Sequence, residues 1–572
     1  MLQLANRAKL GLPALDYNTL IMFHPRPFLR VPACLFAAAA LITVSLAQSQ
    51  RPLNHGDYDG WRSIVGQRLS NDGKFLVYGL FPQEGDGEVV IRNLVTGKEQ
   101  REPAGLRPAP TPPTPGEEGP APEVRGATLT FSSDSKTVVF STFPPKAESD
   151  KAKKDKKPAP KDGMAIVDLA SGKATRVERV KRFAMPEKAS GVLVYLKEGP
   201  DAPAAGAGTS PAAAPKPEGD EEIRAATVRE RFSWPKPEGD QQGGRGGRGG
   251  AAAGAASAAG TGGRGARPEF GTDLVLRNLA DASERTIADV VEFTLTDDGQ
   301  QVVYAVAAHD SARNGVFALK PGSGEAPAAL AEGKGKYAKV TWDENQTQVV
   351  FLSDRDDAAA KQPKWKLYRW ERQSPAANVL ASGDMPGFRQ EFVISDKGTL
   401  TFSRDGTRVF FACAPPAPEK KDDASDAPAD DTKAVVDLWS YKDDYIQPIQ
   451  KVRAERDRNR TFTAVYLIPE HKIVQLGDSA VETVTPSESA QWVMGNDDRA
   501  YRPLADYDEH YADAYLIDAV TGARTLLATK QRGSMTWSPS GRYLLYFDGK
   551  DWNTVSVPDG KKANLTGSSF PD

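Results

Sequence analysis

Cysteine, histidine and net charge are all scarce in this sequence of 572 residues. The two cysteines are Cys34 and Cys413, and Cys34 falls in a segment expected to be removed. No internal disulfide and no zinc site of the CxxC type is therefore predicted. The formal net charge of −3 is close to zero for this length, so it gives no electrostatic reason to expect nucleic acid or an anionic membrane as a partner.

Catalytic motifs are missing as well. The sequence contains no GxSxG motif, no GxxxxGK[ST] loop and no strand-linked GxGxxG. It also lacks the alternating strand and helix segments that an α/β-hydrolase sheet requires. The predicted catalytic, cofactor-binding and metal-binding residues are therefore none.

One cluster of polar residues has the chemistry of a possible metal site. It is the densest such cluster, "DYDEHYADAY" at 506–515, whose alternating carboxylates and histidine have the donors of a calcium site but not the spacing of an EF-hand. A solvated loop is the competing interpretation. Its polar residues are Asp506, Asp508, Glu509, His510 and Asp513. The other histidines, which we expect in the signal segment or in loops, are His24, His55, His309 and His471.

The N-terminus has the pattern of an export signal. Residues 1–47 contain basic residues before the apolar run Val31–Val44, and then the small-x-small sequence Ser45-Leu46-Ala47; Met22 is a plausible true start. The run of about 14 apolar residues is shorter than the roughly 20 that a transmembrane helix needs. We therefore expect signal cleavage, no membrane association afterwards, and a periplasmic or secreted protein.

What the sequence does contain is a repeated phrase. A polar turn rich in Asp, Ser and Gly is followed by alternating apolar residues, and then by a strand and a Gly-containing hairpin. This order predicts a β-propeller, all-β, of about seven to eight four-stranded blades over 51–572, rather than a sandwich. Trp61, Trp342, Trp439, Trp537 and Trp552 are expected to pack between blades. The copies of the phrase begin at 69, 131, 186, 295, 342, 402, 485 and 537.

Low-complexity tracts interrupt the repeat. Their Pro, Lys, Gly, Ala and Asp content cannot bury enough apolar surface to offset ordering entropy, so disordered insertions are predicted. Arg245, Arg248 and Arg264 lie in an RGG-like context that also occurs in RNA-binding segments, but a linker is the better interpretation, because no aromatic residues are interleaved. The tracts are 104–125, 143–163, 200–268 and 414–433.

Two stretches carry a family resemblance. "DYDGWRSIVGQRLSNDGKFLVYGLFPQEGDGEVVIRNLVTGK" (57–98) and "MTWSPSGRYLLYFDGKDWNTVSVPDGKKANLT" (535–566) resemble secreted bacterial members of the prolyl oligopeptidase family, of the dipeptidyl aminopeptidase or acylaminoacyl-peptidase type. The resemblance implies a propeller that limits which peptides reach a C-terminal α/β-hydrolase domain with a Ser-Asp-His triad. No residue of this sequence matches that triad, so the chain is expected to be the catalytically incomplete propeller portion, with peptide substrates or a protein partner.

Two other functions remain open at this stage. A stand-alone periplasmic propeller would act as a protein- or peptide-binding scaffold, and "VVFLSDRDD" (349–357) resembles the propeller of the Tol system. A propeller enzyme such as a lyase or glycosidase would need converging carboxylates or a metal in its central channel.

Overall fold

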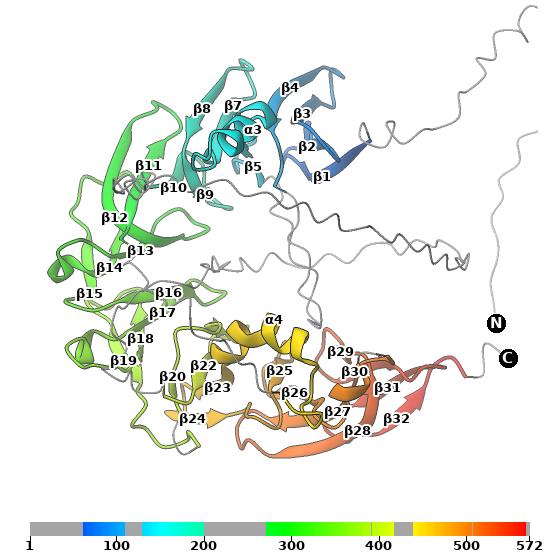
Figure 1. The fold of residues 1–572 in the computed structure, drawn as a ribbon. Coiled ribbons are helices and arrows are strands. Elements are labelled where there is room, and N and C mark those ends of the chain that lie inside the picture. The colour runs from blue at the N-terminus through cyan, green and yellow to red at the C-terminus, as the bar shows by residue number, and fades with distance from the viewer. Residues whose placement is uncertain are drawn as a thin grey trace, which may run out of the picture. The chain divides into compact units, whose positions relative to one another are not determined.

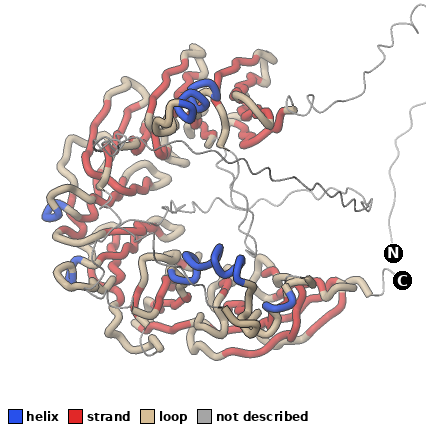
Figure 2. The backbone as a smooth tube through the Cα atoms, viewed as in Figure 1, coloured by secondary structure: helices blue, strands red, loops and turns tan. Residues whose placement is uncertain are grey.

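The structure is a computed structural model, and it describes residues 61–108, 128–199, 270–389, 392–416, 439–505 and 507–567. Antiparallel strands make up almost all of the regular structure (Figure 2). The signal segment 1–47, most of the tract 104–125 and the tract 200–268 lie outside the described residues, as does the tract 414–433 beyond residue 416. Among the described helices, none is long and apolar enough to cross a membrane.

The described strands form eight blades in chain order, which we call blades 1 to 8 (Figure 1); most have four strands of their own, blades 3 and 4 share one strand, and blade 6 has five. Blade 1 contains β1 (Arg62–Leu69), β2 (Phe75–Pro82), β3 (Gly87–Asn93) and β4 (Glu99–Gly105). Blade 2 contains β5 (Leu129–Phe131), β6 (Thr137–Thr142), β7 (Gly163–Asp168) and β8 (Ala174–Glu178). This architecture confirms the predicted all-β propeller of four-stranded blades.

Blades 3 and 4 share one strand. They form a seven-stranded sheet of β9 (Val180–Ala184), β10 (Val192–Lys197), β11 (Thr272–Asn278), β12 (Glu284–Leu295), β13 (Val302–Val306), β14 (Gly315–Leu319) and β15 (Ala328–Glu332). The first half of β12 pairs with β11 as the last strand of blade 3, and its second half pairs with β13 as the first strand of blade 4. Asp289, at a φ of 62°, lies between the two halves.

The remaining strands form blades 5 to 8. Blade 5 contains β16 (Tyr337–Trp342), β17 (Gln348–Ser353), β18 (Lys366–Glu371) and β19 (Asn378–Ala381). Blade 6 contains β20 (Val393–Ile394) and β21 (Thr401–Phe402), which both pair with β22 (Arg408–Ala414), and then β23 (Phe462–Leu467) and β24 (Lys472–Gln475). Blade 7 contains β25 (Thr483–Pro486), β26 (Trp492–Asp497), β27 (Tyr511–Asp518) and β28 (Arg524–Arg532). Blade 8 contains β29 (Thr536–Trp537), β30 (Tyr543–Phe547), β31 (Trp552–Ser556) and β32 (Lys562–Asn564).

The repeated phrase is one turn made in the same way in successive blades. In blade 1 the Gly73 amide donates to the Ser70 carbonyl at 2.9 Å, and the Ser70 hydroxyl accepts from the Phe75 amide at 2.9 Å. Gly73 has a φ of 70°, and its counterparts in other blades lie between 55° and 69°. These counterparts are Ser135, Gly299, Gln346, Gly406, Ala490 and Gly541. The local sequence thus places a left-handed residue at the same point of each turn, even where glycine is absent.

Apolar side chains fill the space between successive blades. Each core cluster draws on two neighbouring sheets, as when Val77 and Val89 of blade 1 pack with Val138 and Phe140 of blade 2. The turns are also joined: the Gln346 side chain exchanges two hydrogen bonds of 2.8 Å with the main chain and carboxylate of Asp297. Each blade is therefore held mainly by its neighbours in the chain, as in other repeat proteins.

The structure differs from the predicted disorder of residues 143–163. This segment contains α3 (Lys146–Lys154) and is anchored by Phe143, which is buried against Phe81 with ring centroids 6.2 Å apart. The Phe143 amide also donates to the Ala104 carbonyl at 2.7 Å. This apolar anchor and the hydrogen bond of 2.7 Å from the Lys146 amide to the Asp86 carboxylate attach the Lys-rich segment to blade 1.

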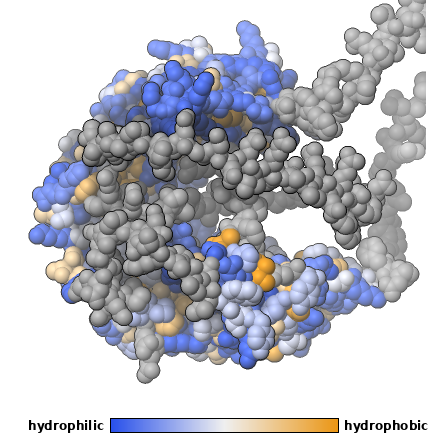
Figure 3. Space-filling model, in the orientation of Figure 1, coloured by the Kyte–Doolittle hydropathy of each residue, from blue (hydrophilic) through white to orange (hydrophobic). Residues whose placement is uncertain are grey.

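Only some of the tryptophans pack between blades as expected. Trp342 lies edge-on to Trp370, with ring centroids 6.0 Å apart, in the core between blades 4 and 5. In contrast, Trp61, Trp439 and Trp552 are each about half exposed or more. Most of the described surface in the space-filling view is hydrophilic, with separate hydrophobic spots (Figure 3).

Candidate functional site

The first strands of neighbouring blades lie side by side. β1 contacts β5, β12 contacts β16, and β16 contacts β21. Bulges interrupt three of these strands, between Val65 and Arg68 in β1, between Val290 and Glu292 in β12, and between Ala338 and Thr341 in β16. Because a β-bulge changes the direction in which a side chain points, these are places where a strand can turn a charged group toward its neighbours.

Glu292 of β12 lies at the centre of a charged group of side chains. Its carboxylate accepts a hydrogen bond of 3.0 Å from the Val340 amide of β16. Burial raises the pKa of Glu292, while the Val340 amide and the positive charges of Arg182 and Lys339 act in the opposite direction. Glu292 is thus a carboxylate between two cations that come from other blades.

Lys339 is the cation on the side of blade 5. It sits in the β16 bulge with a φ of 63°, and its ammonium group donates to the Gly398 carbonyl of blade 6. Burial lowers the pKa of Lys339, opposed by the negative charges of Asp396 and Glu292. A non-glycine residue at this φ costs about 1–2 kcal/mol, so the fold holds Lys339 in a strained conformation.

Arg182 of β9 is the cation on the side of blade 3. Its guanidinium lies over the Phe293 ring, 5.3 Å from the ring centroid. Among the described residues, no hydrogen bond or ion pair engages this guanidinium, although Glu292 acts on it electrostatically. Arg182 is exposed to solvent, and yet burial lowers its pKa. We call Arg182, Glu292 and Lys339 the first-strand cluster.

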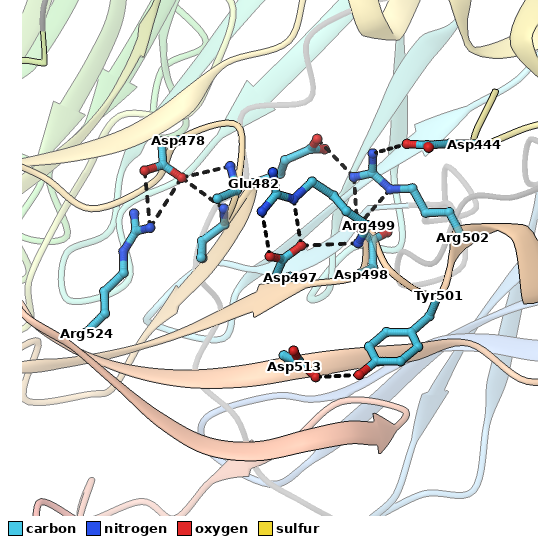
Figure 4. A network of polar contacts seen from close by, with 12 residues as sticks. Asp444, Asp478, Glu482, Asp497, Asp498, Arg499, Tyr501, Arg502, Asp513 and Arg524 are labelled. Atoms are coloured by element: carbon cyan, nitrogen blue, oxygen red, sulfur yellow. Dashed lines mark hydrogen bonds and ion pairs between the residues drawn. The ribbon is translucent and has the colours of Figure 1, made fainter. Parts of the chain in front are cut away.

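A second polar cluster joins blades 6 and 7 and is shown in Figure 4. Arg502, only 8% of whose side chain is exposed, forms ion pairs with Asp444 at 3.1 Å, Glu482 at 2.9 Å and Asp498 at 2.7 Å. Its pKa is raised: burial lowers it, but the hydrogen bonds and charges of Asp498 and Glu482 outweigh that effect. All three ion-pair partners belong to the protein. Arg502 therefore holds the 439–460 segment, which includes α4 (Gln447–Arg458), against blade 7.

Asp478 is the buried carboxylate of the same region. It pairs with Arg389 and with Arg524, whose guanidinium is 3.2 Å away, and it accepts hydrogen bonds from the Ala480 and Val481 amides. Figure 4 shows Arg524 pointing at this carboxylate. A carboxylate with this many donors is already saturated, so Asp478 has a structural role.

In the acidic loop 506–515, which has the donors of a calcium site, the described carboxylates each contact a different protein group. The Glu509 carboxylate pairs with Arg532 at 2.5 Å, Asp513 accepts from the Tyr501 hydroxyl at 2.7 Å, and Asp508 accepts from the Tyr511 hydroxyl at 3.4 Å. Asp506 lies outside the described residues. Within the described part of the chain, no three His, Cys, Asp or Glu side chains form a group suited to a metal ion.

The remaining sequence candidates have ordinary surroundings. The His309 ring packs on Phe270 with centroids 3.7 Å apart, and His471 Nδ1 lies 3.4 Å from the Tyr466 hydroxyl. Cys413 is buried in the core of blade 6, and burial raises its pKa to about 12. His24, His55, Cys34, Arg245, Arg248 and Arg264 lie outside the described residues.

Sequence reasoning missed the first-strand cluster. Arg182 lies in "VKRFA", Glu292 in "VVEFTL" and Lys339 in "KYAKV", and each phrase alone is an ordinary strand with one or two charges. The only local signal is that these charges interrupt predicted first strands. The grouping depends on neighbouring blades lying side by side, which no sequence spacing expresses.

Comparisons with known proteins find only distant similarities. No protein-family model and no curated protein sequence matches this chain. A eukaryotic initiation factor is 11% identical and covers 88% of this chain and 88% of its own, with a TM-score of 0.37. A prolyl endopeptidase structure is 12% identical and covers 92% of this chain and 60% of its own, with a TM-score of 0.32. The acylaminoacyl peptidase of Pyrococcus horikoshii is 9% identical and covers 88% and 59%, with a TM-score of 0.29.

The chain thus spans about three fifths of the length of these two peptidases. Likenesses at such low identity and TM-score carry no argument about activity. The β-propeller assignment rests on the succession of antiparallel blades that the described residues form.

Proposed function

We propose that this chain is the exported propeller portion of a prolyl oligopeptidase-like serine peptidase, where it selects the peptides that reach a hydrolase domain lying outside this sequence. The resemblance of residues 57–98 and 535–566 suggests the family, and the blades supply the kind of framework that such a role needs. The observation that carries the proposal is the first-strand cluster, because a gate must present groups that a passing peptide contacts.

The first-strand cluster suits that role chemically. Arg182, Glu292 and Lys339 come from three different blades, so a peptide that binds to all of them contacts three blades at once. The Glu292 carboxylate can accept from a peptide amide or ammonium, and the cations can donate to a carbonyl or carboxylate. The Arg502 and Asp478 groups, in contrast, already have protein partners.

A serine-hydrolase probe tests the proposal. The native protein, isolated from its source, and the purified 572-residue chain are both treated with a biotinylated fluorophosphonate, and their intact masses are measured. We expect the native protein to exceed 61.6 kDa and to be labelled on a serine outside this sequence, and the purified chain to stay unlabelled. An unlabelled native protein no larger than the processed chain would overturn the proposal.

One observation favours the alternative of a stand-alone binding scaffold. The 439–460 segment turns Arg453 inward over the Tyr445 ring, at 4.3 Å, while it leaves apolar side chains at the surface. Trp439 is 62% exposed and Tyr441 is 88% exposed, and Ile446 and Val452 are each about half exposed. Aromatic and aliphatic groups gathered outside a polar anchor are typical of a protein-binding surface. The mass outcome that overturns the peptidase proposal would support this one.

A further inference from the structure

We propose that Arg182 is the anchor of a binding site for the free carboxylate group of a peptide, completed by Lys339 and tuned by Glu292. The site lies where the first strands of blades 3, 4 and 5 adjoin. The choice of a peptide as the ligand rests on the proposed function, but the recognition of a carboxylate rests on the chemistry of the cluster alone.

The state of Arg182 is the first argument. A guanidinium has five N–H donors in a planar fork, and in folded proteins such groups are normally paired with a carboxylate or a carbonyl oxygen. The described residues offer this guanidinium only the face of Phe293, 5.3 Å from the ring centroid. This contact leaves the N–H donors of the fork without a hydrogen-bond partner among the described residues, as recognition of an external acceptor requires.

The charges around Arg182 set the class of ligand. Lys339 is a second cation, and both cations act electrostatically on Glu292. With Asp396 and Lys397, which also act on Lys339, three cations and two carboxylates leave one positive charge in excess. A carboxylate monoanion would neutralise that excess, whereas a phosphate dianion would meet stronger repulsion from Glu292. The planar fork of arginine also matches the two oxygens of a carboxylate.

The geometry of the strands supports a preformed site. The Val340 amide fixes the Glu292 carboxylate at 3.0 Å, and the Gly398 carbonyl fixes the Lys339 ammonium. Two of the three groups therefore have protein partners that hold them in place, and Arg182 alone has its donors available. A site with one free donor group beside two fixed charges needs little rearrangement to bind.

The experiment compares two peptides that differ in one charge. Isothermal titration of the purified 572-residue chain uses N-acetyl-Ala-Ala-Ala with a free C-terminal carboxylate, and the same peptide as its C-terminal amide. We expect the carboxylate peptide to bind at least about tenfold more tightly, since a charge-assisted hydrogen-bond pair contributes roughly 1.5–3 kcal/mol. Equal binding of the two peptides, or binding of neither, would overturn the site.

Variants identify the groups involved. Arg182→Gln should weaken binding of the carboxylate peptide about tenfold and leave the amide peptide unaffected, whereas Glu292→Gln should strengthen it a few-fold by removing the repelling charge. Lys181→Gln is the matched control, because it removes one positive charge from the adjacent exposed residue of β9 and should change nothing. If Arg182→Gln binds like the wild type, with an unchanged melting temperature, the assignment is wrong.

The outcomes separate this site from the proposed function. A labelled native protein whose propeller ignores the carboxylate would leave the peptidase role intact and remove the site. If the native protein is unlabelled but its propeller still binds the carboxylate through Arg182, the site is supported and belongs to a stand-alone binding protein.

Discussion

At the residue scale, a carboxylate in a repeated turn can accept hydrogen bonds from several donors. Asp298 in the turn of blade 4 accepts from the Thr296 hydroxyl at 2.5 Å and from the Gln300 amide at 2.9 Å, and it pairs with Arg372 at 2.8 Å. Burial raises its pKa, but these hydrogen bonds and the positive charge outweigh burial and bring the pKa to about 2, from an ordinary value of 3.8.

This depressed pKa predicts a pH-dependent contribution to stability. A carboxylate whose pKa is lowered by folding stabilises the native state above its unfolded pKa, and that stabilisation is lost as pH falls through the folded value. Since 43% of the side chain is exposed, Asp298→Asn should cost about 0.5–1 kcal/mol at pH 7. By pH 3 roughly half of that cost should have disappeared. Urea unfolding at both pH values measures it, and a cost that does not change with pH would contradict the assignment.

Cys413 gives a second prediction at this scale. Because burial raises the pKa of its thiol to about 12, the reactive thiolate is almost absent near neutral pH and the sulfur is also out of reach. Iodoacetamide at pH 8 should therefore leave the Cys413 peptide unmodified in the native protein and modify it fully in 6 M guanidinium, as mass spectrometry of the digest can measure. Rapid modification without denaturant would mean that blade 6 opens readily.

At the scale of the element, the unit of construction is the turn between the first and second strands. Its hydroxyl, amide and carboxylate contacts are all made within six residues, as in Ser70, Asp72 and Phe75. The same element also joins blades, because the Asn71 side chain donates to the Ser133 carbonyl at 3.1 Å and the Asp72 amide donates to the Ser135 hydroxyl at 3.2 Å. Each turn therefore shapes one blade and links it to the next.

The left-handed position of this turn can be tested by adding one methyl group. Gly73 has a φ of 70°, and a Cβ there would meet no atom within 4 Å, so Gly73→Ala should destabilise the protein by about 1 kcal/mol through the backbone alone. Gly324 is the matched control: its surroundings are equally open but its φ is not positive, and Gly324→Ala should be neutral or slightly stabilising. Equal effects in the two variants, measured by chemical unfolding, would show that the turn does not require this conformation.

At the scale of the whole molecule, every internal blade is covered on both faces by core clusters shared with its neighbours. Blade 8 is different. Leu544 and Tyr546 face the cluster shared with blade 7, whereas Tyr543, Leu545 and Trp552 on the opposite face are between 37% and 51% exposed. A described core cluster covers only one of its faces.

Two adjacent leucines of β30 test this asymmetry. Leu544 is fully buried and Leu545 is 37% exposed. Leu544→Ala should lower the free energy of unfolding by about 2–4 kcal/mol, because it leaves a cavity in the cluster, and Leu545→Ala should change it by less than about 0.5 kcal/mol. If both substitutions cost the same, the outer face of blade 8 is covered in solution, and size-exclusion chromatography with light scattering would show whether a second copy covers it.

How far the sequence could predict these features depends on the range of the contacts involved. The turn of Ser70 and Gly73 is made by residues next to one another, so its repetition predicted the blades. Helix α3 was missed because its attachment depends on contacts that are distant in the sequence, such as those of Phe143 with Phe81 and of the Lys146 amide with the Asp86 carboxylate. The site at Arg182 was missed for the same reason, since its partners belong to separate blades.

The strand β12 has a consequence for how this chain can be divided. Elsewhere a turn or loop separates the last strand of one blade from the first strand of the next, but blades 3 and 4 meet inside a continuous strand of 12 residues. Cutting the chain at 382–389, between β19 and β20, would leave each piece with whole sheets. Cutting near Asp289 would divide β12 itself, and with it the pairing of Val290 with both Thr272 and Val306. A fragment that keeps this seven-stranded sheet whole therefore has to contain both blades.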